Sequence, residues 1–261
     1  SSIPFYGFVC LCIDHPRTQK LNSKLQNKKV ITYGLSANAD IRATNISYKD
    51  NKMFFLLNIS NLKEHNNKYY KIEFSMIGLH NVQNALATIA IGRELKIPIT
   101  KIKKTLKTFT GIERRFQKVG KFRDTCIIDD YGHHPVEISS ALAAARLITP
   151  KHKIISIFQP HRYSRLRDLF NDFCRCFNDA DHVFLLDVYS AGEEPIQNFE
   201  STDLEIGLSK YGHKNVSYIK DKKTLIKTIL KLAQPNDLII CLGAGSITKI
   251  ANKLEDDLYY E

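Results

Sequence analysis

The sequence predicts an α/β protein with two domains, residues 1–110 and 111–261. With 261 residues, of which 43% are hydrophobic, the chain can bury one large core or two smaller ones. Strand patterns come before helix patterns in the first part of the chain, whereas the two alternate in the second part. We place the domain boundary where these patterns meet, at Thr110–Glu113.

The first domain is expected to contain strands joined by polar turns. Residues 3–13 predict a buried strand, because the run is short, aromatic-rich and followed by His15-Pro16. Alternating patterns predict further strands at 30–34, 41–48, 53–59 and 69–76. Several of these strands are expected to be antiparallel, with turns such as 49–51 and 66–67.

Two helices are expected to complete the first domain. From Asn81 onward the apolar residues recur at the period of an amphipathic helix, which ends before Pro98. A second, shorter helix is expected near residues 102–108.

The second domain contains five apolar runs separated by helical patterns. The runs are Cys126–Ile128, Ile154–Phe158, Val183–Val188, Val216–Ile219 and Leu238–Leu242. The helices are expected near 136–148, 165–178, 202–210, 222–233 and 247–254. This alternation predicts β-α-β units and a mostly parallel sheet covered on both faces. Ligands of such sheets bind outside the carboxyl ends of the strands.

The charge balance is basic, with 38 Lys and Arg against 27 Asp and Glu. The lysines are scattered among Asn and Ile, which favours a biased genome composition over a nucleic-acid site. The apolar run at 3–13 is shorter than the roughly 20 residues of a membrane-spanning helix and lacks signal-peptide features. We therefore expect a soluble, cytoplasmic protein that binds neither nucleic acid nor membrane.

The six cysteines lie in apolar segments, and no pair has zinc-finger spacing. We expect them to be buried, reduced thiols. The chain opens with Ser rather than Met, which indicates a fragment or a processed piece.

Acidic and imidazole side chains crowd the segment Asp129–Pro135, directly after a predicted strand. Such groups can ligate a metal, transfer protons or hydrogen-bond a polar substrate. A solvated turn whose Asp and His cap the next helix is the alternative.

Arginines crowd the segment Gln159–Arg167, after the next predicted strand. Ser164 is expected to cap a helix there, which places Arg162, Arg165 and Arg167 at the positive end of the helix dipole. Cations are unfavourable at that end, so the pattern indicates a bound anion such as phosphate or carboxylate. The alternative is a solvated turn in which the arginines pair with Asp168.

Three further segments contain residues that could bind a ligand. Asn81 and Asn84 are expected on the polar face of the first helical turn after Gly78, where amides can bind a purine ring or simply cap the helix. Arg114-Arg115 lies at the domain junction, a usual place for a ligand. Gly243 and Gly245 are interpreted as a tight turn from a strand to a helix without cofactor binding, and the P-loop pattern G-x-x-x-x-G-K-S/T does not occur.

Taken together, several segments resemble the Mur ligases, and among them the ligases that add L-alanine to UDP-N-acetylmuramate. The segments are GLHNVQNALA, FTGIERRF, DDYGHHPVEI, FQPHRYSRLRDLF, DVYSAGEEPI and GAGSITKI. The HNVQN and RRF patterns are shared more loosely with other Mur and folylpolyglutamate ligases. The resemblance covers nearly the whole chain and implies the latter part of a central ATPase domain, residues 1–110, followed by a Rossmann-like C-terminal domain, residues 111–261.

The resemblance also implies an ATP-dependent amide-forming ligase of peptidoglycan precursor synthesis, with an acyl phosphate intermediate. It assigns ATP to His80, Asn81, Asn84, Arg114 and Arg115. It assigns catalysis to Asp130, His133, Arg162 and Arg165, and substrate binding to Tyr131, His134, His161, Gly192 and Glu193. The P-loop and the Mg²⁺ ligands are expected before residue 1, so the resemblance predicts no metal ligands in this chain and no ligase activity of residues 1–261 alone.

The sequence allows three other functions. A recycling ligase that attaches an intact tripeptide to the same nucleotide sugar shares RRF and the doubled His. A truncated remnant that only binds a nucleotide or a partner subunit would have the same fold. A basic nucleic-acid-binding module would need aromatic residues on a cationic strip, which the sequence does not display.

Overall fold

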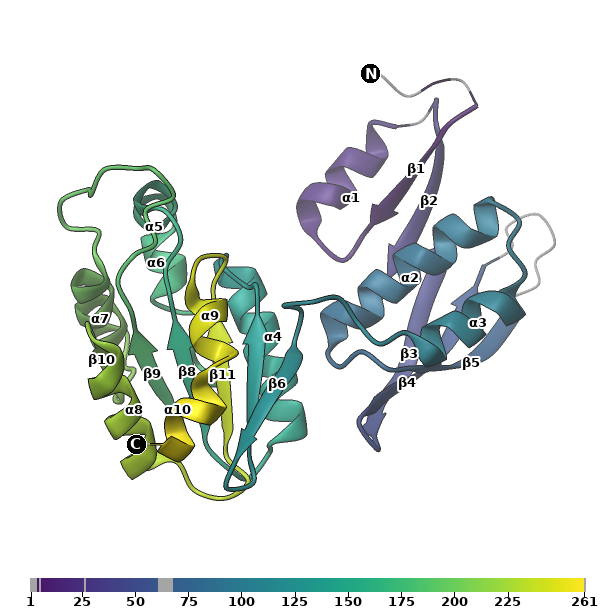
Figure 1. Ribbon diagram of the computed structural model, residues 1–261. Helices are drawn as coiled ribbons and strands as arrows, with labels where there is room; N and C mark the ends of the chain where they lie inside the picture. Colours follow the sequence, from purple (N-terminus) through teal and green to yellow (C-terminus); the bar gives the residue numbers. More distant parts are fainter. Residues whose placement is uncertain (1–3, 5, 26, 61–67, 261) are drawn as a thin grey trace. The chain divides into compact units, whose positions relative to one another are not determined.

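The computed structural model describes residues 4, 6–25, 27–60 and 68–260. The chain divides into two compact units, residues 1–111 and 112–261, one residue from the boundary expected from the sequence. Figure 1 shows both units, and each is described separately below.

The first unit is built on a five-stranded sheet of order β1-β2-β3-β4-β5. The strands are β1 (Phe8–Cys12), β2 (Lys29–Gly34), β3 (Ile41–Lys49), β4 (Lys52–Ile59) and β5 (Lys68–Phe74). β1, β2 and β3 pair in parallel, whereas β3, β4 and β5 pair antiparallel. The antiparallel strands and the turn at 49–51 confirm the prediction, since Asp50 (φ 50°) and Asn51 (φ 58°) form the left-handed pair of a tight hairpin. The predicted turn at 66–67 lies outside the described residues.

Among its described residues, this unit has the helices α1 (Pro16–Ser23), α2 (Leu79–Glu94) and α3 (Ile99–Thr108). Val82, Leu86 and Ile89 of α2 are fully buried against the sheet, as the helical period predicts. The sequence did not predict α1, because this helix buries no residue and therefore has no apolar stripe. β1 was expected to be buried, yet at the sheet edge only Leu11 of its residues is buried.

The second unit contains a six-stranded sheet of order β10-β9-β8-β11-β7-β6. Its strands are β6 (Gln117–Phe122), β7 (Thr125–Asp130), β8 (Ile154–Phe158), β9 (His182–Leu185), β10 (Val216–Tyr218) and β11 (Leu238–Leu242). Its helices are α4 (Pro135–Ile148), α5 (Tyr163–Asp168), α6 (Phe170–Phe173), α7 (Ser201–Lys210), α8 (Lys222–Leu232), α9 (Ile247–Ala251) and α10 (Leu254–Tyr260). All strand pairs are parallel except β6 with β7, which confirms the mostly parallel sheet.

Apolar side chains cover both faces of this sheet. Ile128, Phe158 and Ile240 point to the face covered by α4, α5, α6 and α7. Ile127 and Ile239, their neighbours in sequence, point to the face covered by α8, α9 and α10. Figure 1 shows the sheet between these two layers. Because successive side chains alternate, burial on both faces requires the continuous apolar runs seen in the sequence.

Several predicted boundaries in the second unit were wrong. The helix expected over 165–178 is broken, since α5 ends at Asp168 and Leu169, whose backbone angles (φ −120°, ψ 20°) are not helical, separates it from α6. The strand expected over 183–188 ends at Leu185. β6 was missed because its polar residues face solvent at the sheet edge.

The cysteines are free, but only Cys174, Cys176 and Cys241 are buried. Cys10, Cys12 and Cys126 are partly exposed, so the expectation of six buried thiols was wrong for half of them. Within the described part of the chain, no helix has the length and apolar character needed to cross a membrane.

Candidate functional site

The carboxyl ends of β7, β11 and β8 lie side by side in the second unit. Leu242, the last residue of β11, pairs with Asp130 of β7 on one side and with Phe158 of β8 on the other. The turns that follow these strands therefore begin at the same edge of the sheet, where parallel sheets bind ligands. We define the carboxyl-edge cluster as the residues Tyr131, His133, His161, Arg162 and Arg165, which lie on these turns or in α5.

Asp130 holds the backbone around this cluster. Its Oδ2 accepts a hydrogen bond from the Phe116 N–H at 2.8 Å, and its Oδ1 accepts one from the Gly132 N–H at 2.7 Å. Asp130 is buried, and burial raises the pKa of its carboxyl group despite these hydrogen bonds. Since both oxygens bind backbone groups, Asp130 positions the turn rather than facing a substrate.

The two arginines before β6 differ in their contacts. Arg114 Nη2 donates to the Gly243 carbonyl at 2.6 Å, and its Nε lies 3.7 Å from the buried Asp129. Arg115 is exposed, and its Nη1 lies 3.5 Å from Glu137 Oε1. Both guanidinium groups lie over the Tyr131 ring, at 4.8 and 5.4 Å from its centroid. Arg114 is thus held inside the unit, which leaves Arg115 as the arginine available to a ligand.

His133 and His134 are fixed by Glu137 of α4. Glu137 Oε2 accepts hydrogen bonds from the backbone N–H groups of His133 at 3.1 Å and His134 at 3.3 Å. Burial alone would raise the pKa of Glu137, but these hydrogen bonds and the charges of His133 and Arg115 lower it. His134 Nδ1 accepts from the Val136 N–H at 3.3 Å and caps the helix. The interpretation of this turn as a helix cap therefore holds for His134, because its Nδ1 accepts a hydrogen bond from the backbone at the start of α4.

His161 lies between the loop after β9 and the turn after β7. Its ring stacks on Tyr189, with centroids 5.4 Å apart and an interplanar angle of 16°, and lies 5.8 Å from the His133 ring. Arg165 Nη1 contacts both the His161 carbonyl at 3.0 Å and His161 Nδ1 at 3.1 Å. The structure thus brings His133, His161 and Arg165 close together.

The start of α5 differs from the prediction. Arg162 is the N-cap with φ 71° and ψ 133°, a conformation unusual for a residue with a side chain. Ser164 does not cap the helix, because its N–H and Oγ donate to Glu193 at 2.9 and 2.6 Å. Arg165 and Arg167 fall in the last turn of this six-residue helix, so the dipole argument for a bound anion was wrong for both. Arg167 pairs with Asp168 at 2.8 Å, as the alternative interpretation of that turn predicts.

The loop that carries Gly192 and Glu193 reaches the cluster through Glu193. The two hydrogen bonds from Ser164 lower the pKa of Glu193, which is consequently ionised. Gly192 is exposed, with φ 88°. Glu193 therefore fixes the start of α5, and its oxygens are engaged with Ser164.

Sequence reasoning missed three residues that shape the site. Glu137 follows the doubled His by three residues, a capping-box spacing that a pattern search could have found. Gln159 Oε1 accepts a hydrogen bond from the Ile247 N–H at 3.0 Å and so fixes the turn that contains Gly243 and Gly245. A Cβ on Gly243 (φ 147°) would lie 2.7 Å from the Gln159 carbonyl, so this turn requires glycine and the tight-turn interpretation stands. Tyr189 lies in the DVYSAGEEPI segment, but its residue type alone does not predict a role at the site.

The residues expected to bind ATP in the first unit lie at the start of α2. Asn84 is exposed and His80 is half-buried. Asn81 was expected on the polar face, but it is buried and its Nδ2 donates to the Ile77 carbonyl at 2.8 Å. Asn81 thus fixes the helix start, and its Oδ1 accepts from Asn84 Nδ2 at 3.5 Å.

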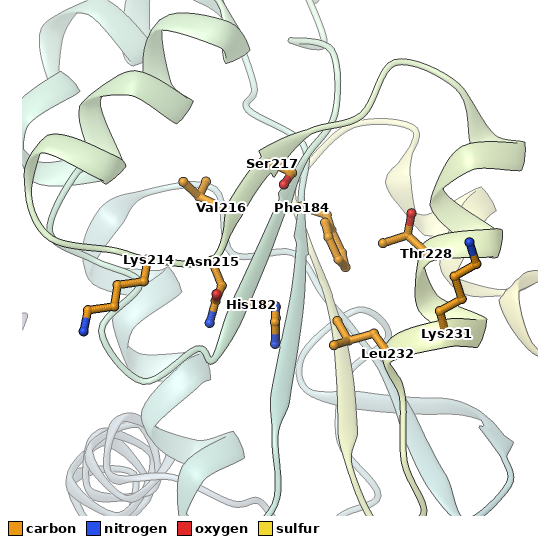
Figure 2. Close-up of a pocket in the computed structure, with 9 residues that line it drawn as sticks. All are labelled: His182, Phe184, Lys214, Asn215, Val216, Ser217, Thr228, Lys231 and Leu232. Atoms are coloured by element: carbon orange, nitrogen blue, oxygen red, sulfur yellow. The ribbon is translucent and has the colours of Figure 1, made fainter.

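The described residues contain no group of three or more His, Cys, Asp or Glu side chains that could hold a metal ion. A pocket of 430 Å³ lies beside β9, β10 and α8, and Figure 2 shows its lining. His182 and Val216 line it at the amino ends of their strands, so this pocket lies away from the carboxyl-edge cluster.

Two family descriptions match the chain. "Mur ligase middle domain" matches residues 1–92, and "Mur ligase, glutamate ligase domain" matches residues 114–245. The UDP-N-acetylmuramate–L-alanine ligase of Rhodospirillum rubrum is 45% identical over 98% of this chain and 53% of its own length. The ligase of the same name from Paracoccus denitrificans is 44% identical over 99% of this chain and 55% of its own length. The chain spans about half the length of the curated relatives it matches.

Solved structures share the fold. UDP-N-acetylmuramate-alanine ligase MurC from Thermotoga maritima matches with a TM-score of 0.69 and 24% identity, over 88% of this chain and 47% of that chain. The MurF ligase of Thermotoga maritima in complex with ADP matches with a TM-score of 0.73 and 14% identity, over 98% of this chain and 54% of that chain. Since the glutamate ligase domain description alone matches about half of the sequence, the chain belongs to the Mur ligase family.

Proposed function

We propose that this chain is part of an ATP-dependent ligase that joins L-alanine to the carboxylate of UDP-N-acetylmuramate in peptidoglycan precursor synthesis. The observation that carries the proposal is the identity of 42–45% over 98–99% of the chain to eight UDP-N-acetylmuramate–L-alanine ligases. ATP and a nucleotide sugar are cytoplasmic compounds, so we place the reaction in the cytoplasm.

The domain assignment follows the family descriptions. We propose that residues 1–110 are the latter part of the central ATP-binding domain and residues 111–261 the C-terminal domain. The match of the middle-domain description to residues 1–92 supports the first assignment. The match of the ligase-domain description to residues 114–245 supports the second.

In the proposed reaction, the muramyl carboxylate takes the γ-phosphoryl group of ATP, and the amine of L-alanine attacks the acyl phosphate. Catalysis of this kind depends on positioning the reactants and neutralising charge. The carboxyl-edge cluster supplies two guanidinium groups, two imidazoles and a phenol within one set of turns. Arg162 is exposed at the start of α5 and is suited to bind the phosphoryl or alanine carboxylate oxygens. Asp130 acts as a positioning residue in this scheme.

We assign ATP to the exposed Asn84 and Arg115 and to the half-buried His80. Asn84 and His80 at the start of α2 are suited to the adenine, and Arg115 is suited to the ribose and phosphates. The contacts of Arg114 and Asn81 within their own units favour a supporting role for these two residues. The Mg²⁺ ion that accompanies ATP is expected to be held by residues outside this chain.

A ligation assay tests the proposal. The protein is expressed from the complete genomic reading frame that encodes residues 1–261. It is then supplied with ATP, UDP-N-acetylmuramate and either L-alanine or an intact tripeptide. We expect ADP release that depends on L-alanine. Release that depends only on the tripeptide, or no release with either, would contradict the proposal. Residues 1–261 alone, which contain no P-loop, are expected to release no ADP.

A further inference from the structure

The ring nitrogens of His133 have defined hydrogen-bonding roles. Nδ1 lies 3.0 Å from the Tyr131 carbonyl oxygen and 3.4 Å from Glu137 Oε2. A carbonyl and an ionised carboxylate can only accept hydrogen bonds, so the Nδ1 of His133 must carry a proton to bind them. The neutral ring then has its lone pair on Nε2.

The roles are reversed in His161. Its Nδ1 lies 3.1 Å from Arg165 Nη1. A guanidinium can only donate, so the Nδ1 of His161 must accept, and the proton of the neutral ring lies on Nε2. Burial lowers the pKa of His161, and the charges of Arg165, His133 and Arg162 lower it further, against an opposing effect of Glu193. These effects keep the ring neutral at neutral pH.

The two rings are neighbours held by different elements. Their centroids are 5.8 Å apart, and Tyr189 packs against His161 with its ring nearly parallel. On the other side, the Tyr131 ring meets His133 edge-on, with centroids 5.1 Å apart. Aromatic packing therefore restricts the orientation of both imidazoles in addition to the hydrogen bonds at Nδ1.

We propose that His133 and His161 form a complementary pair at the carboxyl-edge cluster, with an Nε2 lone pair on His133 and an Nε2–H donor on His161. The Tyr131 carbonyl and Glu137 set the tautomer of His133, and Arg165 sets that of His161. Glu137 and Arg165 are thus positioning residues, and Arg165 acts through His161 rather than only as a charge for a phosphate.

The use of this pair rests on the proposed function. L-Alanine arrives as an ammonium ion, which gives one proton to His133 Nε2. The free amine then forms the bond to the carbonyl carbon, the C–O bond to phosphate breaks with its electron pair on the phosphate, and the second nitrogen proton leaves with the phosphate. His161 Nε2–H donates a hydrogen bond to an oxygen of the reacting acyl group.

The tautomers can be measured without substrate. Long-range ¹H–¹⁵N correlation spectra of ¹⁵N-labelled residues 1–261, recorded at about pH 8 and above the usual histidine pKa, distinguish a protonated ring nitrogen from one with a lone pair. The two rings are assigned with His133→Gln and His161→Gln. We expect the Nδ1–H form for His133 and the Nε2–H form for His161. The opposite form in either ring, or an average of both forms, would overturn the proposal.

A variant pair tests the positioning role of Arg165. Arg165→Met keeps an unbranched side chain but removes the guanidinium donors, and we expect His161 to lose its single tautomer while His133 keeps its own. Arg167→Met is the matched control, because Arg167 lies in the same helix and contacts Asp168; neither ring should change. An unchanged His161 in Arg165→Met would overturn this role, and the wild-type spectra decide the tautomers whether or not the variant folds.

The proposed function and the histidine pair can be disproved independently of each other. Spectra of the expected kind with no alanine-dependent ligation would remove the proposed function and leave the pair in place. Alanine-dependent ligation with the opposite tautomers would remove the pair alone.

Discussion

Some residues in and around the carboxyl-edge cluster hold the backbone in place, whereas others are available to bind a ligand. Asp130 is the clearest example of a residue that holds the backbone. Both of its oxygens accept backbone N–H groups, and burial raises its pKa. A carboxyl group whose pKa is raised on folding stabilises the protein below its unfolded pKa of about 4, and this contribution is lost as the pH rises through the folded value. The pH dependence of stability therefore reports on Asp130.

We expect the difference in unfolding free energy between the wild type and Asp130→Asn to shrink as the pH rises above about 4, since the amide does not ionise. Urea unfolding at a series of pH values measures this difference. Asp168→Asn, at an exposed position of the same unit, serves as the control. A difference that grows with pH would show that ionised Asp130 is the more stabilising form.

The adjacent arginines give a second prediction at this scale. Arg114→Ala removes a donor to the Gly243 carbonyl and a cation near the buried Asp129, so we expect a loss of about 1–3 kcal/mol in stability. Arg115→Ala is expected to change stability by less than about 0.5 kcal/mol, because Arg115 is exposed. Urea unfolding of both variants measures the contrast, and equal losses would contradict it.

The sequence located these arginines but could not separate their roles. Residue type suggested that both face a ligand at the domain junction. Arg114 (φ 58°) and Phe116 (φ 51°) on either side of Arg115 both have left-handed backbone conformations. Such conformations are uncommon for residues other than glycine, so no local sequence pattern predicts them.

At the scale of elements, the start of α5 combines backbone strain with candidate function. Arg162 has φ 71° and ψ 133°, where only glycine is unstrained. We expect Arg162→Gly to be more stable than Arg162→Ala by about 1 kcal/mol, because both remove the side chain and only glycine relieves the strain. Urea unfolding compares the two variants, and a more stable alanine variant would exclude strain at this position.

Elements with a buried apolar pattern were predictable, and elements without one were not. α2 and the strands β8 and β11 follow from their apolar periods, because burial dictates residue type. α1 buries no residue, and β6 lies at a sheet edge with polar residues toward solvent. The break at Leu169 depends on tertiary packing, since the apolar period continues through it to Phe173 and Phe177.

At the scale of the whole molecule, each unit has a core of its own. The clusters on the two faces of the second sheet contain only residues from 116 onward. We therefore expect residues 112–261 to fold when expressed alone. Dispersed amide signals in a ¹H–¹⁵N spectrum that overlay those of the same residues in the 1–261 chain would bear this out. A spectrum collapsed to unfolded shifts would contradict it.

At this scale, the proposed function requires an acyl phosphate that is formed from the muramyl carboxylate and broken by an amine. Ligation by the complete reading frame, with ¹⁸O in the carboxylate of UDP-N-acetylmuramate, tests this step directly, and mass spectrometry of the released phosphate provides the measurement. Passage through the acyl phosphate predicts that one ¹⁸O atom from the carboxylate appears in the phosphate. Phosphate without the label, released along with the alanine amide, would contradict the account.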